Sequence, residues 1–133
     1  MTTLATDKSR TYELGDLNSF PVVATDIIYE GAAVGLSSGN ARPLNAGDQF
    51  VGFCIQNVDN STGSAGDMRV QVKTYGEIQL AIGSLAATDV GKPVYASDDD
   101  TFTKTSSGNS KIGWCSRYIS SGVGIVEFEA IRA

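Results

Sequence analysis

Apolar and polar residues alternate along much of the chain with the two-residue period of a half-buried β-strand. The clearest examples are residues 68–73 and 77–82, in which every second side chain is Met, Val, Ile or Leu. Residues 20–24, 27–30 and 50–58 are dense in β-branched and aromatic residues and predict further strands. The pattern therefore predicts a chain made mostly of short strands.

Turn-forming residues separate the predicted strands. Glycines and an asparagine punctuate residues 31–40, and residues 59–66 form a stretch rich in Asn, Ser, Thr and Gly. No segment keeps the 3.6-residue period of a helix for three turns, although residues 84–90 leave room for a single helical turn. We therefore expect an all-β fold.

An internal repeat with a period of about sixty residues organises the predicted strands. Three segments of the first half recur in the same order in the second half: GAAV at 31–34 and GKPV at 91–94, VGFC at 51–54 and IGWC at 112–115, VQV at 70–72 and VEF at 126–128. Each copy is a strand–loop–strand–loop–strand meander that is too small to bury its own apolar face. Two meanders packed face to face predict a small β-sandwich or a barrel-like domain.

Residues 1–19 are polar, are rich in Thr and Asp, and keep no lasting periodicity. Only residues 11–14 alternate enough to suggest a short strand. We predict an N-terminal arm over residues 1–19 and a single β-domain over residues 20–133. The arm is either a frayed terminus or a segment that becomes ordered on a partner.

Composition narrows the classes of function. The 133 residues are 41% hydrophobic and 19% charged, which is typical of one globular domain. The chain has no His, which removes the Ser-His-Asp triad and the commonest ligand of zinc and iron. Its net charge of −5, with ten basic residues scattered along it, argues against a nucleic-acid-binding surface.

Two further patterns bear on location. No apolar run approaches the roughly 20 residues that cross a bilayer, and the N-terminal residues lack the apolar core of a signal peptide. We therefore expect a soluble protein that is made in a cytoplasm and has no membrane partner.

The two cysteines invite a disulfide or metal interpretation. Cys54 and Cys115 each follow a Gly-aromatic pair at equivalent points of the repeat. We expect both to be buried free thiols that fill the same small apolar space, with a disulfide as the alternative. Two thiols without His make a poor metal site, and no cofactor is expected.

The acidic residues give no catalytic constellation. The consecutive carboxylates at 98–100 lack the spacing of a calcium loop and predict a solvated hairpin tip, with a weak cation site as the alternative. Glu127 and Glu129 share one face of a strand, which we expect to face solvent. Glycoside hydrolysis would also need a cleft with aromatic residues, and the single Trp, Trp114, is expected in the core. Asn60 begins a formal glycosylation sequon, but nothing in the sequence places it in a secretory lumen.

Four segments resemble the capsid decoration proteins of tailed bacteriophages, also called cement or head-stabilising proteins. They are VGF at 51–53, VDNS at 58–61, GKPVY at 91–95 and KIGW at 111–114, and the similarity covers roughly residues 20–131. The resemblance implies a β-rich, non-enzymatic structural protein on the outer capsid surface of the virion. Such a protein commonly forms a homotrimer that bridges neighbouring major capsid protein subunits at local threefold positions.

The arm is the first candidate for contact with the capsid because the repeat leaves it unexplained. It carries Asp7, Lys8, Arg10 and Tyr12, and Tyr and Arg are favoured anchors at interfaces. Arg42, in the predicted loop 37–49, is a second candidate. The alternative function is a carbohydrate- or surface-binding β module, such as a head-fibre or adhesive domain, which would present exposed aromatic side chains on one face.

Overall fold

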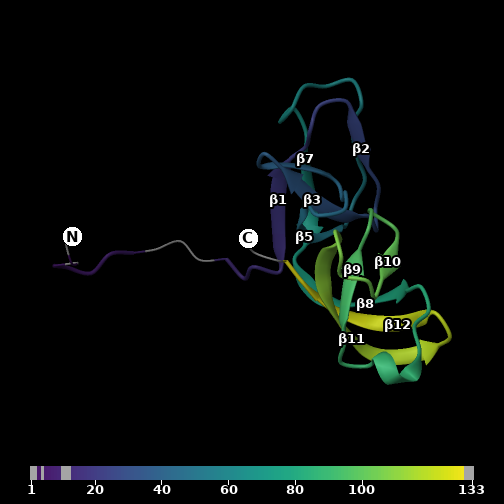
Figure 1. Ribbon diagram of the computed structural model, residues 1–133. Coiled ribbons are helices and arrows are strands. Elements are labelled where there is room, and N and C mark those ends of the chain that lie inside the picture. The colour runs from purple at the N-terminus through teal and green to yellow at the C-terminus, as the bar shows by residue number, and fades with distance from the viewer. Residues whose placement is uncertain (1–2, 4, 10–12, 131–133) are drawn as a thin grey trace.

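A computed structural model describes residues 3, 5–9 and 13–130 of the chain. The described residues form strands and one 3-10 turn, as Figure 1 shows, so the all-β prediction is confirmed. The elements in chain order are β1 (Leu17–Pro21), β2 (Asp26–Ile28), β3 (Ala33–Ser37), β4 (Asn40–Pro43), β5 (Gln49–Cys54), β6 (Val58–Asn60), β7 (Arg69–Lys73), β8 (Tyr75–Ala81), η1 (Ala87–Asp89), β9 (Pro93–Ala96), β10 (Phe102–Thr103), β11 (Ser110–Ser120) and β12 (Val123–Glu129).

Two five-stranded antiparallel sheets carry the internal repeat. The strand order is β1-β7-β5-β3-β4 in the first sheet and β8-β12-β11-β9-β10 in the second. Each strand of the first sheet therefore has a counterpart at the same place in the second, and the prediction of two repeated meanders is confirmed. A two-stranded ribbon, β2-β6, is an addition to the first copy.

Backbone hydrogen bonds match between the copies. Equivalent strands are joined by the same pair of bonds: Gly31 N–H to the Cys54 carbonyl and Cys54 N–H to the Ala32 carbonyl in the first copy, Gly91 N–H to the Cys115 carbonyl and Cys115 N–H to the Lys92 carbonyl in the second, at 2.8 and 2.9 Å in each copy. The repeat is thus a repeat of backbone geometry as well as of sequence.

The predicted alignment of the third pair of repeat segments is wrong by two residues. The sequence repeat predicts that residues 70–72 are equivalent to residues 126–128, whereas in the structure Cys54 pairs with Val72 and Cys115 pairs with Val126. Val72 is therefore equivalent to Val126, a shift of two residues. A pattern of period two fits any even shift equally well, so only the pairing of strands could decide the register.

Several predicted boundaries also change. β1 begins at Leu17, so residues 17–19 of the predicted arm are paired with β7. The predicted strand at 50–58 ends at Cys54 and resumes as β6. The helical turn allowed at residues 84–90 is the 3-10 turn η1.

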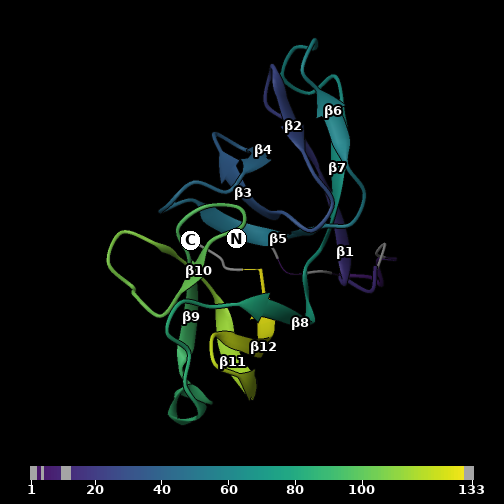
Figure 2. The same cartoon turned by 90° about the vertical axis from the view of Figure 1, so that its right-hand side faces the viewer.

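Two apolar clusters place the sheets in layers. The larger lies between the two sheets and includes the aromatic rings of Phe50, Phe53, Phe102 and Phe128, whose centroids lie 4.9 to 6.3 Å apart. The second lies between the first sheet and the β2-β6 ribbon. Figures 1 and 2 show the resulting order of ribbon, first sheet and second sheet, so the two sheets form a small β-sandwich with a ribbon on one side. Within the described residues no helix has the length and apolar character of a membrane span.

Candidate functional site

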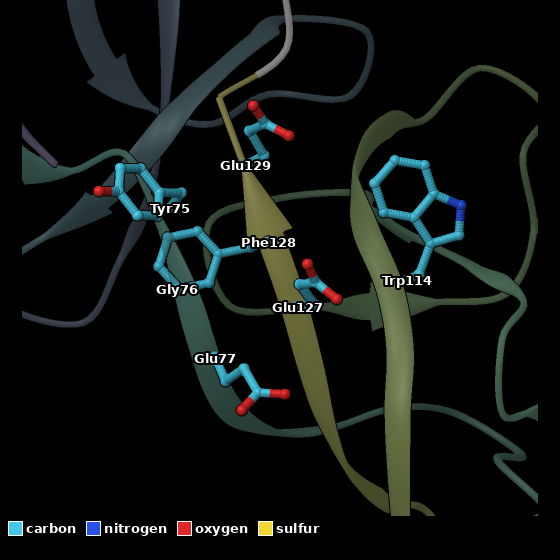
Figure 3. Close-up of a pocket in the computed structure, with 7 residues that line it drawn as sticks. All are labelled: Tyr75, Gly76, Glu77, Trp114, Glu127, Phe128 and Glu129. Atoms are coloured by element: carbon cyan, nitrogen blue, oxygen red, sulfur yellow. The ribbon is translucent and has the colours of Figure 1, made fainter. Parts of the chain in front are cut away.

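The outer face of the second sheet carries a shallow groove of about 490 Å³. Its lining residues come from three adjacent strands and are drawn in Figure 3: Tyr75, Gly76 and Glu77 of β8, Trp114 of β11, and Glu127, Phe128 and Glu129 of β12.

Strand register explains why these side chains meet. Trp114 pairs with Glu127, which pairs in turn with Glu77, so these three form one row across the sheet. Glu129 and Tyr75 form the next pair on the same face, because residues two apart on a strand point to the same side. The groove is thus a patch of three carboxylates bounded by two aromatic side chains.

Trp114 is 39% exposed, so the expectation that it is a core residue is wrong. Its equivalent in the first sheet, Phe53, is 4% exposed and packs against Phe102 and Phe128. The same repeat position is therefore buried in one copy and open in the other. Residue type and periodicity give no signal for this difference, because it depends on which face of each sheet is covered.

The two sheets pack through faces that are not equivalent. Phe53 belongs to the face of the first sheet that meets the second sheet, whereas Trp114 points away from the first. Cys115 points into the space between the sheets, while its equivalent Cys54 faces the ribbon. The Trp114 face is consequently the one that no described element covers.

The carboxylates make this face of the second sheet a surface that accepts hydrogen bonds. Glu77 and Glu127 lie directly opposite each other, an arrangement of like charges that costs stability. The Ser116 hydroxyl donates to Glu77 Oε1 at 2.7 Å. The Lys111 ammonium lies 4.3 Å from the ring centroid of Trp114. The carboxylates suit a ligand that carries hydroxyl or amine donors, and the aromatic rings suit its apolar face.

Among the predicted capsid-binding residues that the structure describes, Asp7 and Lys8 do not come together with Arg42. Asp7 and Lys8 lie on the exposed segment ahead of β1, which Figure 1 shows leading away from the body (purple). Arg10 and Tyr12 lie outside the described residues. Arg42, in β4, makes a two-point contact with the carboxylate of Asp48, at 2.7 and 2.9 Å.

The Arg42–Asp48 pair is built into the first sheet. Partial burial favours the neutral acid, but the Arg42 guanidinium and the Asn45 N–H outweigh that effect and hold the pKa of Asp48 below its ordinary value. Gly35 makes room for the pair, since a Cβ there would lie 2.6 Å from the Cβ of Asp48. Arg42 therefore has a structural role within the body.

Both cysteines are buried and free, as expected. Burial raises the pKa of the Cys54 thiol, with a backbone hydrogen bond at Gln56 acting in the opposite direction. A buried thiol with a raised pKa is a weak nucleophile. Cys54 and Cys115 hold equivalent strand positions, but Cys54 lies in the cluster under the ribbon and Cys115 in the cluster between the sheets, so the prediction that they fill the same apolar space is wrong.

The other polar candidates have structural explanations. Residues 98–100 form the tip of the β9–β10 hairpin, closed by a hydrogen bond from the Ser97 N–H to the Thr101 carbonyl. Glu127 and Glu129 face solvent as expected. Among the described residues, no three Cys, Asp or Glu side chains are arranged to hold a metal ion.

Asn60, of the glycosylation sequon, is 2% exposed. Its side-chain nitrogen donates to the carbonyls of Val22, Val23 and Ser64 at 2.9 to 3.4 Å. That nitrogen is the atom to which a glycan would be attached, so the folded protein does not present this sequon. Asn60 instead ties the polar loop to the chain after β1.

Comparisons of the chain with protein-family models and with curated protein sequences return no match.

Proposed function

We propose that this protein binds the outside of a tailed-bacteriophage capsid, as a homotrimer at local threefold positions, and stabilises the head by bridging major capsid protein subunits. The resemblance at residues 51–53, 58–61, 91–95 and 111–114 motivates the proposal. The observation that carries it is the segment ahead of β1. Its described residues 3, 5–9 and 13–15 are all exposed, although it leads directly into a paired strand.

An exposed arm on a rigid body suits attachment to a lattice. The arm loses conformational entropy when it becomes ordered, but it can cover a large surface of its partner. Three arms on one trimer would raise one another's effective concentration once the first is bound, so weak contacts add up to slow dissociation. Shearing neighbouring capsid subunits apart would then require breaking contacts to the shared trimer.

The arm is now the stronger of the two predicted capsid-binding regions. The guanidinium of Arg42 is already held by Asp48, whereas Lys8 is exposed and lies outside the sheets. We therefore assign capsid contact to the arm, with Asp7, Lys8, Arg10 and Tyr12 as its candidate anchors.

Co-sedimentation with expanded heads that lack this protein tests the proposal. We expect saturable binding near one copy per major capsid subunit, and loss of binding when residues 1–14 are deleted. The truncated chain should keep the circular dichroism spectrum of the full chain. Lys8→Glu should weaken binding to heads, whereas Lys111→Glu, which reverses an equal charge on the second sheet, is its control and should not. Equal saturation of heads by the truncated chain would sink the arm assignment, and no binding by the full chain in any expansion state would sink the whole proposal.

The groove on the second sheet favours a second candidate, a carbohydrate-binding module. Trp114 and Tyr75 are the exposed aromatics on one face that such a module needs, and the three carboxylates between them can accept hydrogen bonds from sugar hydroxyls. On a glycan array, binding by the wild-type protein that disappears in Trp114→Ala and Tyr75→Ala would support this function. Tyr29→Ala, an exposed tyrosine outside the groove, is the control.

A further inference from the structure

The outer edge of β8 is the least protected sheet edge among the described strands. β8 ends the order of the second sheet and has seven residues without a proline. At the other three ends of the five-stranded sheets, β1 contains Pro21, β4 contains Pro43 and β10 has only two residues. The two strands of the ribbon, β2 and β6, have only three residues each. Proline and shortness are the usual means of keeping an edge from pairing with another chain. β8 lacks both, so its edge is available to an additional strand.

A second groove, different from the one beside Trp114, lies along this edge. It has a volume of about 330 Å³ and is mostly apolar. Ile78 of β8 and Phe128 line one side of it, and Phe53 and Ile55 line the other. Ile55 is 37% exposed although it follows directly after a buried strand. Side chains of a strand point alternately to its two faces. A strand added to β8 would therefore direct every second side chain over this groove.

Leu14 is the most exposed of the large hydrophobic residues in the described chain, at 91%. It lies just ahead of β1, within residues 11–14, whose alternation suggests a short strand. A leucine fully exposed beside polar neighbours contributes nothing to its own fold. Its side chain is thus free to be buried in a partner, and that burial would stabilise the contact.

Within one molecule, the groove and the base of the arm lie on opposite sides of the β7–β8 connection. The Thr74 N–H donates to the Asp16 carbonyl, and the Thr74 carbonyl accepts from the Ala130 N–H. The N–H and the carbonyl of one strand residue point to the same edge, so the base of the arm lies on the β12 side of the β7–β8 connection. The groove lies on the other side, with β5. The groove is therefore placed for an arm that arrives from another molecule.

We propose that the segment carrying Leu14 adds to the free edge of β8 in a second copy of this protein, with Leu14 seated in the groove beside Ile55 and Ile78. The contact joins two different surfaces, and such a contact closes a ring of three when each copy is rotated by a third of a turn relative to the next. This inference rests on the homotrimer of the proposed function and names the surfaces that would form it. Tyr12 belongs to the segment 11–14 that adds to β8 in this proposal, so Asp7, Lys8 and Arg10, which precede that segment in the sequence, are the candidate anchors left for the capsid.

Light scattering of the full-length protein after size-exclusion chromatography tests the contact. We expect the wild type to be oligomeric, and Leu14→Asp and Ile55→Asp each to weaken association at least about tenfold. Met68→Asp is the matched control, because Met68 is an exposed apolar residue outside the groove. Circular dichroism shows whether each variant is folded. A wild type that stays monomeric up to about 100 μM, where a contact of ordinary specificity would be populated, or an unchanged Leu14→Asp oligomer, overturns the inference.

Cross-linking between two variants makes the test independent of any folding defect. Leu14→Cys and Lys73→Cys, an exposed residue that also lines the groove, are mixed and oxidised. We expect a disulfide-linked dimer that contains one copy of each variant. Every variant in this test also carries Cys54→Ser, because Cys54 is a free thiol that lines the same groove. A mixture of Leu14→Cys with Met68→Cys should then give no dimer of one copy each, and equal yields from both mixtures would contradict the contact.

Head binding separates this inference from the proposed function. If the wild type is monomeric and binds heads, the result supports capsid attachment and contradicts the β8 contact. If the wild type forms an oligomer that depends on Leu14 but does not bind heads, the result supports the β8 contact and contradicts capsid attachment.

Discussion

Gly52 and Gly113 occupy the same position in the two copies of the repeat, directly after a bulged residue. Val51 in β5 and Ile112 in β11 are each passed over in the pairing with the neighbouring strand. A bulge bends its strand and increases its local twist. At both positions the backbones come so close that a Cβ on the glycine would collide with a carbonyl, that of Lys73 for Gly52 and that of Glu127 for Gly113. Glycine at these two sites is required by a close approach of two backbones.

Gly113→Ala should therefore destabilise the protein by about 2 kcal/mol or more, because the collision can be relieved only by moving β12. Gly83→Ala is the control, since a Cβ at Gly83 meets nothing within 4 Å; it should change the free energy of unfolding by less than about 0.5 kcal/mol. Urea denaturation measures both. Equal effects of the two substitutions would contradict the close approach.

The Arg42–Asp48 pair makes a pH-dependent contribution to stability. Because the pKa of Asp48 is lower in the folded state, this contribution is present above the unfolded value of about 3.9 and is lost as pH falls through the folded pKa. Asp48→Asn should lower the Tm at pH 7, and the difference from wild type should shrink below about pH 4. Thermal unfolding followed from pH 7 to pH 2.5 checks this. Asp7→Asn, on the exposed arm, should leave the Tm at pH 7 unchanged; a constant Asp48→Asn difference at all pH values would refute the linkage.

The β2-β6 ribbon is the element that distinguishes the first copy of the repeat from the second. It consists of two three-residue strands, and the connections on either side of it carry residues 22–25 and 61–68. In the second copy, β11 passes directly into β12 through a short turn. Ile28 and Val58 of the ribbon cover the apolar face that includes Cys54. The insertion thus supplies a cover for one face of the first sheet.

Because the ribbon is small, it should open locally before the two sheets separate. Cys54 lies under the ribbon and Cys115 lies between the sheets, so a thiol reagent should label Cys54 first under native conditions. Mass spectrometry of peptides from a labelling time course distinguishes the two sites. Cys54→Ser should remove the fast phase and leave the slow one. Earlier labelling of Cys115 would show that the ribbon is not the weaker cover.

For the molecule as a whole, the packing of the two sheets decides which faces are covered. The sheets stack through non-equivalent faces, so the stack has two different ends. The ribbon covers the end at the first sheet, and the row of Trp114, Glu127 and Glu77 forms the end at the second. A charged row discourages a further apolar sheet from packing there, since burying unpaired carboxylates is costly. The open end is therefore suited to a polar ligand.

Truncation of equivalent aromatic residues should show this asymmetry. Phe53→Ala should cost about 3–5 kcal/mol, as for a fully buried phenylalanine. Trp114→Ala should cost less than about 1.5 kcal/mol, because that side chain remains 39% exposed. Chemical denaturation of both variants measures the difference. Similar losses would show that Trp114 is buried in solution, for example by a partner copy.

Local pattern was enough to predict the all-β class, the repeat and the equivalent burial of Cys54 and Cys115. Alternation with period two reports which residues share a face, and the Gly-aromatic-Cys segments mark equivalent strands. The same pattern could not set the register of residues 126–128, because every shift by two residues keeps the alternation. It predicted strands at residues 27–30 and 50–58, which overlap β2 and β6, but it could not show that these short strands pair as a ribbon, because three-residue strands hold too few positions to show a period.

The sequence by itself therefore determined the kind of secondary structure and the unit that is repeated, since both depend on residues close together in the chain. Only the tertiary structure decided that Trp114 is open while Phe53 is buried, that Arg42 is held by Asp48, and that β8 has an unprotected edge. Each of these depends on which surfaces of distant segments meet. The residues around Trp114 and around Phe53 share one local pattern, and that pattern does not say which of the two faces another sheet will cover.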